Sequence, residues 1–207
     1  MEKNWKQPGP AAPRIGAVLM ASGFSRRFGG NKLLEPVEGI AMYERAFQAL
    51  PAGLFQRAVV ASTCPEILQA AARLGYLSIP NPQAAEGQSA SLRLGLARLL
   101  DMDGVLFAVC DQPWLRRNSV ERLFEEFAGH PDRICALSWQ GQRGNPAIFP
   151  SALFPALMRL TGDRGGGAVI RSCPQLLRTV EVEDFRELRD VDSPEALGEC
   201  GTPHGKV

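Results

Sequence analysis

The sequence predicts an α/β fold in which a mostly parallel sheet is covered by helices on both faces. Three observations lead to this prediction. Short apolar runs of strand length alternate along the chain with longer segments of helical periodicity. The apolar runs are nearly continuous, as in strands that are buried on both faces. Proline, glycine and hydroxyl residues separate the two kinds of segment, which is typical of turns and helix starts.

The expected strands share an apolar centre and a length of four to six residues. The clearest is GVLFAV at 104–109, and the run at 57–62 is centred on Ala58, Val59 and Val60. In chain order, the expected strands are residues 15–20, 57–62, 76–79, 104–109, 134–139, 146–149 and 177–182.

The expected helices combine apolar spacing with a start or stop signal. The first ends before Pro51, the second starts after Thr63 with Pro65 in its first turn, and Asn118 is the expected cap of another. In chain order, the helices cover 42–50, the segment that starts at 64, 88–100, 118–127, 151–160, 167–173 and a last one that starts at 193–195.

Composition limits the class of protein. We expect residues 14–207 to form one domain and residues 1–13, with three prolines and no apolar periodicity, to be a disordered leader. A net charge of +1 argues against a nonspecific nucleic-acid binder, and no apolar stretch approaches the roughly 20 residues of a membrane helix. The N-terminus does not resemble a secretory signal, and the five cysteines lack metal-ligand spacing, so we expect a cytoplasmic protein with free thiols.

The stretch that follows the first strand is rich in glycine and positive charge. Its glycines let the backbone turn tightly and approach a ligand, and consecutive amides in such a turn form an anion site. Arg26, Arg27 and Lys32 add charge suited to phosphate oxygens. Neither the P-loop motif nor the dinucleotide-binding motif is present. The stretch indicates a polyphosphate cradle; the alternative is an exposed loop whose arginines pair with nearby acids.

Two aspartates are expected at the same edge of the sheet. Asp111 directly follows the strand at 104–109, and ligands of open α/β sheets bind at the carboxyl ends of strands. An aspartate there suits Mg²⁺, which takes one or two carboxylates together with phosphate oxygens; the alternative is a helix cap or a loop contact. Asp192, after the last strand, either approaches the same metal or caps the helix that follows.

Three further segments carry weaker signals. GQSASL at 87–92 opens a helix with hydroxyls and free amides, which suit a base, a ribose or a phosphate but also serve any helix start. Two glycine-rich turns, at 141–146 and 162–167, each carry an arginine. Loops of this kind are often functional in compact domains, although they are also where ordinary turns occur.

Six segments together resemble one family, the MobA-like nucleotidyltransferases that activate the molybdenum cofactor, and within it the CTP-dependent cytidylyltransferases. The segments occur in the family's order between about residues 15 and 198: LMASGFSRRFGGNKLL, GQSASLRLGL, CDQPWL, GQRGNPAIF, LTGDRGGGAVI and RDVDSPEAL. The resemblance implies a Rossmann-like three-layer α/β/α fold of the nucleotide-diphospho-sugar transferase type. It also implies Mg²⁺-dependent transfer of CMP from CTP to the terminal phosphate of a molybdopterin-type acceptor, with release of pyrophosphate.

The resemblance assigns roles to residues that match the family's motifs. Arg27, Lys32 and Asp111 would be catalytic, and Asp111 and Asp192 would hold Mg²⁺. The nucleotide would be bound by Ala21, Ser22, Gly23, Arg27, Lys32, Gly87, Ser89 and Asp111. The acceptor would be bound by Arg143, Asn145 and Asp163. The implied partners are the nucleoside triphosphate, the molybdopterin-type acceptor and a molybdoenzyme that receives the product, with no nucleic acid and no membrane.

The chain departs from the family's pattern at a few positions. Ser22 and Phe28 stand where Ala and Met are more usual, and Asn145 stands where the family usually has His. Asparagine forms hydrogen bonds but does not titrate near neutral pH, so this change bears on the identity of the acceptor. Two alternatives remain open: a nucleotidyltransferase that uses GTP or another donor and a different acceptor such as a sugar phosphate, and a noncatalytic protein that holds and hands on the cofactor.

Overall fold

The computed structural model describes residues 12–23 and 28–197. Nearly all of the expected leader therefore lies outside the described residues. Of the five cysteines, the four at 64, 110, 135 and 173 are described, and these are free thiols. Within the described part of the chain, no helix has the length and apolarity that are needed to cross a membrane.

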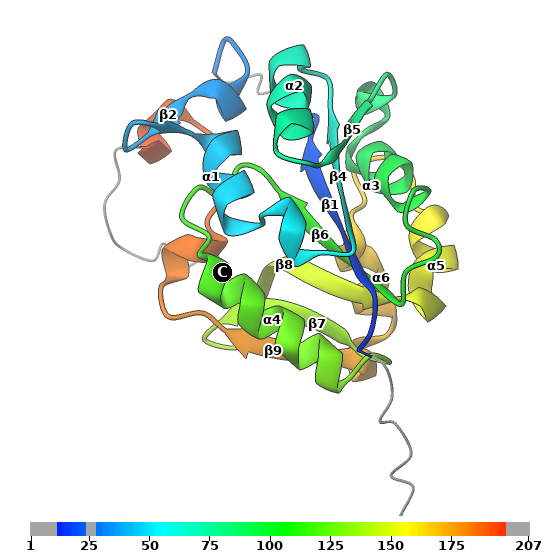
Figure 1. Cartoon of the computed structure of the whole chain (residues 1–207). Coiled ribbons are helices and arrows are strands. Elements are labelled where there is room, and N and C mark those ends of the chain that lie inside the picture. The colour runs from blue at the N-terminus through cyan, green and yellow to red at the C-terminus, as the bar shows by residue number, and fades with distance from the viewer. Residues whose placement is uncertain (1–11, 24–27, 198–207) are drawn as a thin grey trace, which may run out of the picture.

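A seven-stranded sheet forms the centre of the fold (Figure 1). Its strand order is β5-β4-β1-β6-β8-β7-β9. The strands are β1 (Ile15–Ala21), β4 (Arg57–Ser62), β5 (Leu77–Pro80), β6 (Gly104–Val109), β7 (Ile134–Trp139), β8 (Gln142–Pro150) and β9 (Leu177–Glu181). Strand β8 is antiparallel to both of its neighbours and the other pairs are parallel, so the predicted mostly parallel α/β fold is confirmed.

Helices cover both faces of this sheet, as predicted (Figure 1). The helices α1 (Met42–Ala49), α2 (Pro65–Arg73) and α4 (Arg117–Gly129) pack on one face, and α3 (Gln88–Leu96), α5 (Phe154–Met158) and α6 (Gly166–Ser172) on the other. The pleat of β1 directs Leu19 into the first core and Val18 into the second, and both side chains are fully buried. Burial of each such side chain contributes about 1.5–3 kcal/mol to folding, which makes β1 a rigid support for the loop that follows it.

Several short elements complete the fold. A two-stranded hairpin, β2 (Pro36–Val37) and β3 (Ile40–Ala41), was not predicted. Short 3₁₀ helices of three or four residues also occur: η1 (Lys32–Leu34), η2 (Ala52–Leu54), η3 (Ala84–Glu86), η4 (Ser151–Leu153), η5 (Pro174–Leu176), η6 (Phe185–Leu188) and η7 (Pro194–Leu197). The last of these stands where the sequence predicts a helix starting at 193–195.

Several helix boundaries differ from the prediction: the helix expected at 151–160, for example, is the short 3₁₀ helix η4 followed by α5, and the boundaries of α4 and α3 also differ. Helix α4 begins at Arg117, so Asn118 lies inside it, and the backbone N–H of Arg116 donates to Oε2 of Glu187 over 3.1 Å. A carboxylate from another part of the chain thus binds at the helix start, which sequence spacing does not reveal. Helix α3 ends at Leu96 instead of residue 100, and the hydrogen-bonded turns that follow it leave Leu99 buried.

Strand β8 is longer than the expected strand at 146–149. It includes most of the segment that the sequence predicts as a glycine-rich turn at 141–146, and the β7–β8 turn is centred on Gln140 and Gly141, both with positive φ. Glu181 of β9 holds this turn by accepting hydrogen bonds from the backbone N–H of Gln140 and of Gly141 (2.8 and 2.9 Å). Because β8 runs against β6, its first residues lie beside the carboxyl end of β6.

Candidate active site

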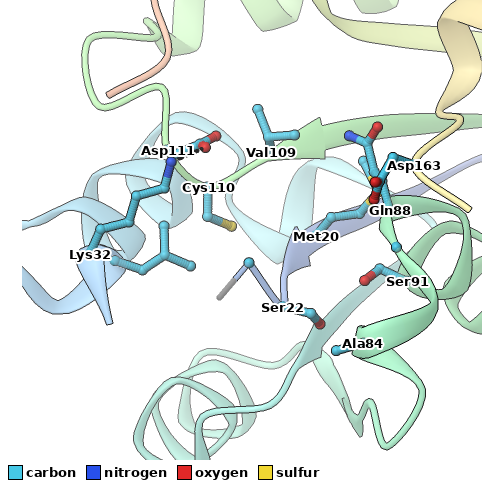
Figure 2. Close-up of a pocket in the computed structure, with 13 residues that line it drawn as sticks. Met20, Ser22, Lys32, Ala84, Gln88, Ser91, Val109, Cys110, Asp111 and Asp163 are labelled. Carbon is cyan, nitrogen blue, oxygen red and sulfur yellow. Dashed lines mark ion pairs between the residues drawn. The ribbon is translucent and has the colours of Figure 1, made fainter. Parts of the chain in front are cut away.

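Lys32 and Asp111 meet at the carboxyl edge of the sheet, as the sequence predicts. Asp111 directly follows β6, and Lys32 opens η1, whose start is fixed by Asn31, because its Oδ1 accepts the backbone N–H of Leu33 over 3.1 Å. The Nζ atom of Lys32 lies 2.7 Å from Oδ2 of Asp111 (Figure 2). The loop after β1 and the end of β6 therefore face one another across a single site.

A third segment, residues 190–192, closes this site. The backbone N–H of Val191 donates to the carbonyl of Asp111 over 2.9 Å, and its own carbonyl accepts from Nζ of Lys32 over 2.8 Å. Oδ1 of Asp192 lies 3.1 Å from the same Nζ atom. The side chain of Lys32 is 10% exposed and that of Asp111 21%, whereas that of Asp192 is 67% exposed. Asp192 thus lies at the solvent side of the pair.

The charges of this group influence one another strongly. Burial alone would lower the pKa of the Lys32 ammonium, but the charge and hydrogen bond of Asp111, with those of Asp192, raise it above its ordinary value. Desolvation of the Asp190 carboxyl and repulsion from Asp111 raise the pKa of Asp190 to about 6. The Nε2 group of Gln112 donates to Oδ1 of Asp190 over 2.9 Å and fixes its position. Gln112 was assigned no role from the sequence, and Asp190 only that of a possible cap of the helix that follows.

The acidic residues fit a divalent cation of the Mg²⁺ type. Oδ1 of Asp111 is buried without a hydrogen-bond partner, although a buried carboxylate oxygen ordinarily has one. No group of three or more His, Cys, Asp or Glu side chains within residues 12–23 and 28–197 is arranged to hold a metal. Asp111 and Asp192 would therefore hold the cation together with ligand oxygens and water, which is the coordination that Mg²⁺ accepts.

A cavity of about 280 Å³ lies next to this group, between the ends of β1 and β6 and the start of α3 (Figure 2). Among its lining residues are Ser22, Gly23, Lys32, Gly87, Ser91 and Asp111. A Cβ atom on Gly87, whose φ is +97°, would lie 2.5 Å from the carbonyl carbon of Gly162. Only glycine allows α3 to approach the 162–163 turn this closely, so Gly87 shapes the cavity wall.

A buried asparagine links the two sides of the cavity. The Nδ2 group of Asn81, which is 3% exposed, donates to Oγ of Ser22 over 3.1 Å and to Oγ of Ser91 over 2.9 Å. Its Oδ1 atom accepts the backbone N–H of Gln83 over 3.1 Å. The end of β1 and the first turn of α3 are thereby held together through one side chain.

The structure places two predicted nucleotide contacts away from the cavity and leaves one undescribed. Ser89 is fully buried, with its N–H donating to the Gly162 carbonyl, and Ser91 lines the cavity instead. Ala21 is 2% exposed and does not line the cavity. Arg27 lies outside the described residues.

The expected acceptor residues line a second cavity, of about 300 Å³. Arg143, Asn145 and Asp163 all contribute to its wall, together with Arg164 and Arg171. The side chains of the three arginines make no ion pair with any of the described residues. Met20, Gln88 and Asp163 line both cavities, so the two adjoin. Unpaired guanidinium groups in a concave site suit an anionic ligand.

The model of the MobA-like NTP transferase domain matches residues 17–180. The chain belongs to this family. The first five of the six segments that resemble this MobA-like family lie wholly within the matched range. The predicted family is thereby confirmed.

Two relatives of this MobA-like domain have names from different areas of metabolism. Nicotine blue oxidoreductase of Paenarthrobacter nicotinovorans is 28% identical over 196 residues, which cover 89% of this chain and 95% of that protein. Purine catabolism protein PucB of Bacillus subtilis is 29% identical over 201 residues, covering 89% and 94%. The names agree on neither substrate nor reaction.

Solved structures share the fold. The manganese complex of Rv0371c from Mycobacterium tuberculosis H37Rv superposes with a TM-score of 0.74 at 22% identity, covering 88% of this chain and 95% of that one. The neighbours confirm the α/β fold of the nucleotide-diphospho-sugar transferase type.

Sequence reasoning missed several residues of this MobA-like site. Asn81 precedes Pro82 directly after a strand, but its contacts cross the cavity, and no local signal shows them. Ser91 was indicated only as part of GQSASL; Ser89 and Ser91 lie on different sides of the helix, and the motif does not show which side faces the cavity. Arg171 directly follows the LTGDRGGGAVI segment but was assigned no role from the sequence, and the packing of α6 brings it to the second cavity.

Proposed function

We propose that the protein is a cytoplasmic, Mg²⁺-dependent cytidylyltransferase that transfers CMP from CTP to the terminal phosphate of a molybdopterin-type acceptor and releases pyrophosphate. The observation that carries the proposal is the contact between Lys32 and Asp111 at the edge of the first cavity. The ammonium group of Lys32 and the carboxylate of Asp111, a potential metal ligand, meet where ligands of open α/β sheets bind. Membership of the NTP transferase family supports the reaction class.

The first cavity takes the nucleotide in this proposal. Lys32, with Arg27 and the amides of the loop after β1, binds the triphosphate. Ser22, Gly23 and Ser91 border the same cavity and contact the nucleoside or its phosphates. Asp111 and Asp192 hold the Mg²⁺ ion, which neutralises phosphate charge when it is bound.

The second cavity takes the acceptor. Arg143, Arg164 and Arg171 carry positive charge that no described carboxylate neutralises, and this charge matches an acceptor that ends in a phosphate. Asn145 and Asp163 supply hydrogen bonds to the remainder of the acceptor. Because Asp163 lines both cavities, an acceptor phosphate bound there adjoins the nucleotide.

The chemistry requires positioning and charge neutralisation more than proton transfer. The terminal phosphate of the acceptor attacks the α-phosphorus of CTP; the new P–O bond forms as the bond to pyrophosphate breaks. This nucleophile is already anionic, so no general base is needed. The residues that line the two cavities are consistent with a reaction that uses no histidine base, because the described histidine, His130, lies at the end of α4 and lines neither cavity. Lys32 and the arginines stabilise the charge as the oxygens approach.

One experiment tests the identity of both the nucleotide that is consumed and the acceptor that receives the nucleotidyl group. Pyrophosphate release is measured with CTP, GTP and ATP in the presence of Mg²⁺ and molybdenum cofactor, and the pterin product is identified by mass spectrometry. We expect a CMP adduct and pyrophosphate in equal amounts with CTP, and none when the acceptor is omitted.

Other outcomes select the alternatives. Turnover with GTP would show a guanylyltransferase, and turnover with a sugar phosphate in place of the pterin would show a different acceptor. Pterin binding without turnover of any triphosphate would indicate a noncatalytic cofactor carrier. Because the named relatives include an oxidoreductase and a purine catabolism protein, the acceptor panel includes phosphorylated compounds beyond pterins.

A further inference from the structure

The ammonium group of Lys32 has no hydrogen-bond donor left for a ligand. A lysine ammonium carries three N–H donors. In the structure its Nζ atom is within hydrogen-bond distance of three oxygens: Oδ2 of Asp111 (2.7 Å), the carbonyl of Val191 (2.8 Å) and Oδ1 of Asp192 (3.1 Å). Lys32 therefore cannot bind a triphosphate in the position that it occupies here.

The three oxygens that surround this ammonium are also of the kinds that coordinate a hard divalent cation. Two carboxylates and a backbone carbonyl are typical ligands of such ions. Oδ1 of Asp111, buried and without a partner, is available to the same ion. Moving the ammonium away without replacing its charge would leave Asp111 as a poorly solvated and uncompensated anion, which is strongly unfavourable.

We propose that Lys32 and the divalent cation occupy the same site in turn: Lys32 fills it in the free protein and yields the oxygens of Asp111, Val191 and Asp192 as its ammonium turns to the triphosphate. This inference rests on the proposed function, which assigns Lys32 to the phosphates. It adds Val191 as a carbonyl ligand of the site. It also implies that the free protein binds metal weakly, because the ion must displace an ammonium with three hydrogen bonds.

Removal of the ammonium tests this competition. Mn²⁺ is titrated into the nucleotide-free protein and its binding followed by electron paramagnetic resonance. We expect Lys32→Met to bind Mn²⁺ about tenfold more tightly than wild type or better, since a close positive charge is removed. The double variant Lys32→Met/Asp111→Asn should lose this gain. As a control, Arg57→Met removes the cation of the Arg57–Asp101 pair at the amino end of β4 and should leave Mn²⁺ binding unchanged.

A second readout separates displacement from charge repulsion at a distance. The labelling rate of Lys32 by an amine-reactive reagent is measured by mass spectrometry in wild type, with and without saturating Mn²⁺. Displacement predicts that the buried, slowly labelled amine becomes several-fold more reactive when Mn²⁺ binds, and that Asp111→Asn abolishes this effect of Mn²⁺. Simple repulsion predicts binding without a change in labelling, and that result would overturn the shared site.

The two proposals fail in different ways. If Lys32→Met binds Mn²⁺ no more tightly than wild type while wild type still releases pyrophosphate from CTP, the shared site is wrong and the proposed function stands. If wild type turns over no triphosphate, the proposed function fails, whatever the Mn²⁺ titrations show.

Discussion

Gly87 lies so close to Asp163 that a Cβ atom on the glycine would be 2.5 Å from Oδ1 of the aspartate. This contact joins the start of α3 to the turn before α6, at the place where the two cavities adjoin. Glycine at position 87 thus lets the wall of the first cavity approach the residue that lines both cavities.

We expect Gly87→Ala to lower the free energy of unfolding by about 2–4 kcal/mol, because the new methyl group overlaps the 162–163 turn and the residue must keep a positive φ. Urea denaturation measures this loss. Gly30→Ala is the matched control: a Cβ there meets nothing within 4 Å, and its φ is not positive, so stability should change little. Equal effects of the two substitutions would contradict this account of Gly87.

Asp111→Asn should lower Mg²⁺-dependent pyrophosphate release by about a hundredfold or more, since it removes the charge that balances Lys32 and that, in the proposed function, holds the metal. The variant keeps the shape of the side chain, and near-ultraviolet circular dichroism verifies that it folds. Near-normal turnover in a folded Asp111→Asn protein would exclude Asp111 from the catalytic group.

Asn81→Ala should raise the KM for the triphosphate, because Ser22 and Ser91 lose their common hydrogen-bond donor and the cavity walls are no longer tied. Loss of these buried bonds should also cost about 1–3 kcal/mol of stability. The control is Ser78→Ala, which removes one side-chain hydrogen bond, to the Leu68 carbonyl, away from both cavities and should leave this KM unchanged. A KM unchanged in Asn81→Ala would show that Asn81 supports only the fold.

Arg143→Gln should raise the KM for the acceptor about tenfold and leave the KM for the triphosphate unchanged, because a charge-assisted contact is lost from the second cavity alone. Steady-state kinetics with each substrate varied in turn measures the two values. Arg133→Gln, whose side chain bonds the Gln175 carbonyl away from both cavities, is the control. Equal increases in both KM values would argue against separate subsites.

The pKa of Asp190, raised to about 6 from its ordinary value of 3.8, predicts a dependence of stability on pH. Between these values the folded protein holds a proton that the unfolded chain releases, so this group makes the free energy of unfolding fall as pH rises from about 4 to 6. Asp190→Asn keeps an oxygen for Gln112 and should remove this decline. Urea denaturation at pH 4, 5, 6 and 7 measures it; an identical pH profile in wild type and variant would refute the assignment.

The fold was predictable wherever one local pattern determined the element. The strands Arg57–Ser62, Gly104–Val109 and Ile134–Trp139 have the predicted bounds, because each is a short apolar run between clear turn signals. The β2–β3 hairpin was missed because its strands have two residues each. In the structure Glu38 and Gly39 both have positive φ, as a tight hairpin turn requires, but glutamate is not one of the residues that usually mark the first of these positions.

The site was predictable only where topology forces residues together. Lys32 and Asp111 follow neighbouring parallel strands, so they must reach the same edge, and they do. The contacts of Asn81, Gln112 and Glu187 depend on packing between segments far apart in the chain. Ser89 was chosen over Ser91 because a sequence motif does not show which side of a helix faces the ligand.

The reversed direction of β8 has a consequence for how such a protein can diversify. Arg143 and Asn145 are carried by one arm of a hairpin whose tip is fastened by Glu181, apart from β1 and β4, which support the other cavity. In the proposed function, substitutions or insertions in that arm would alter the acceptor that binds without disturbing the nucleotide. Relatives of one ancestry can thus acquire unrelated substrates by remodelling a single ribbon of chain.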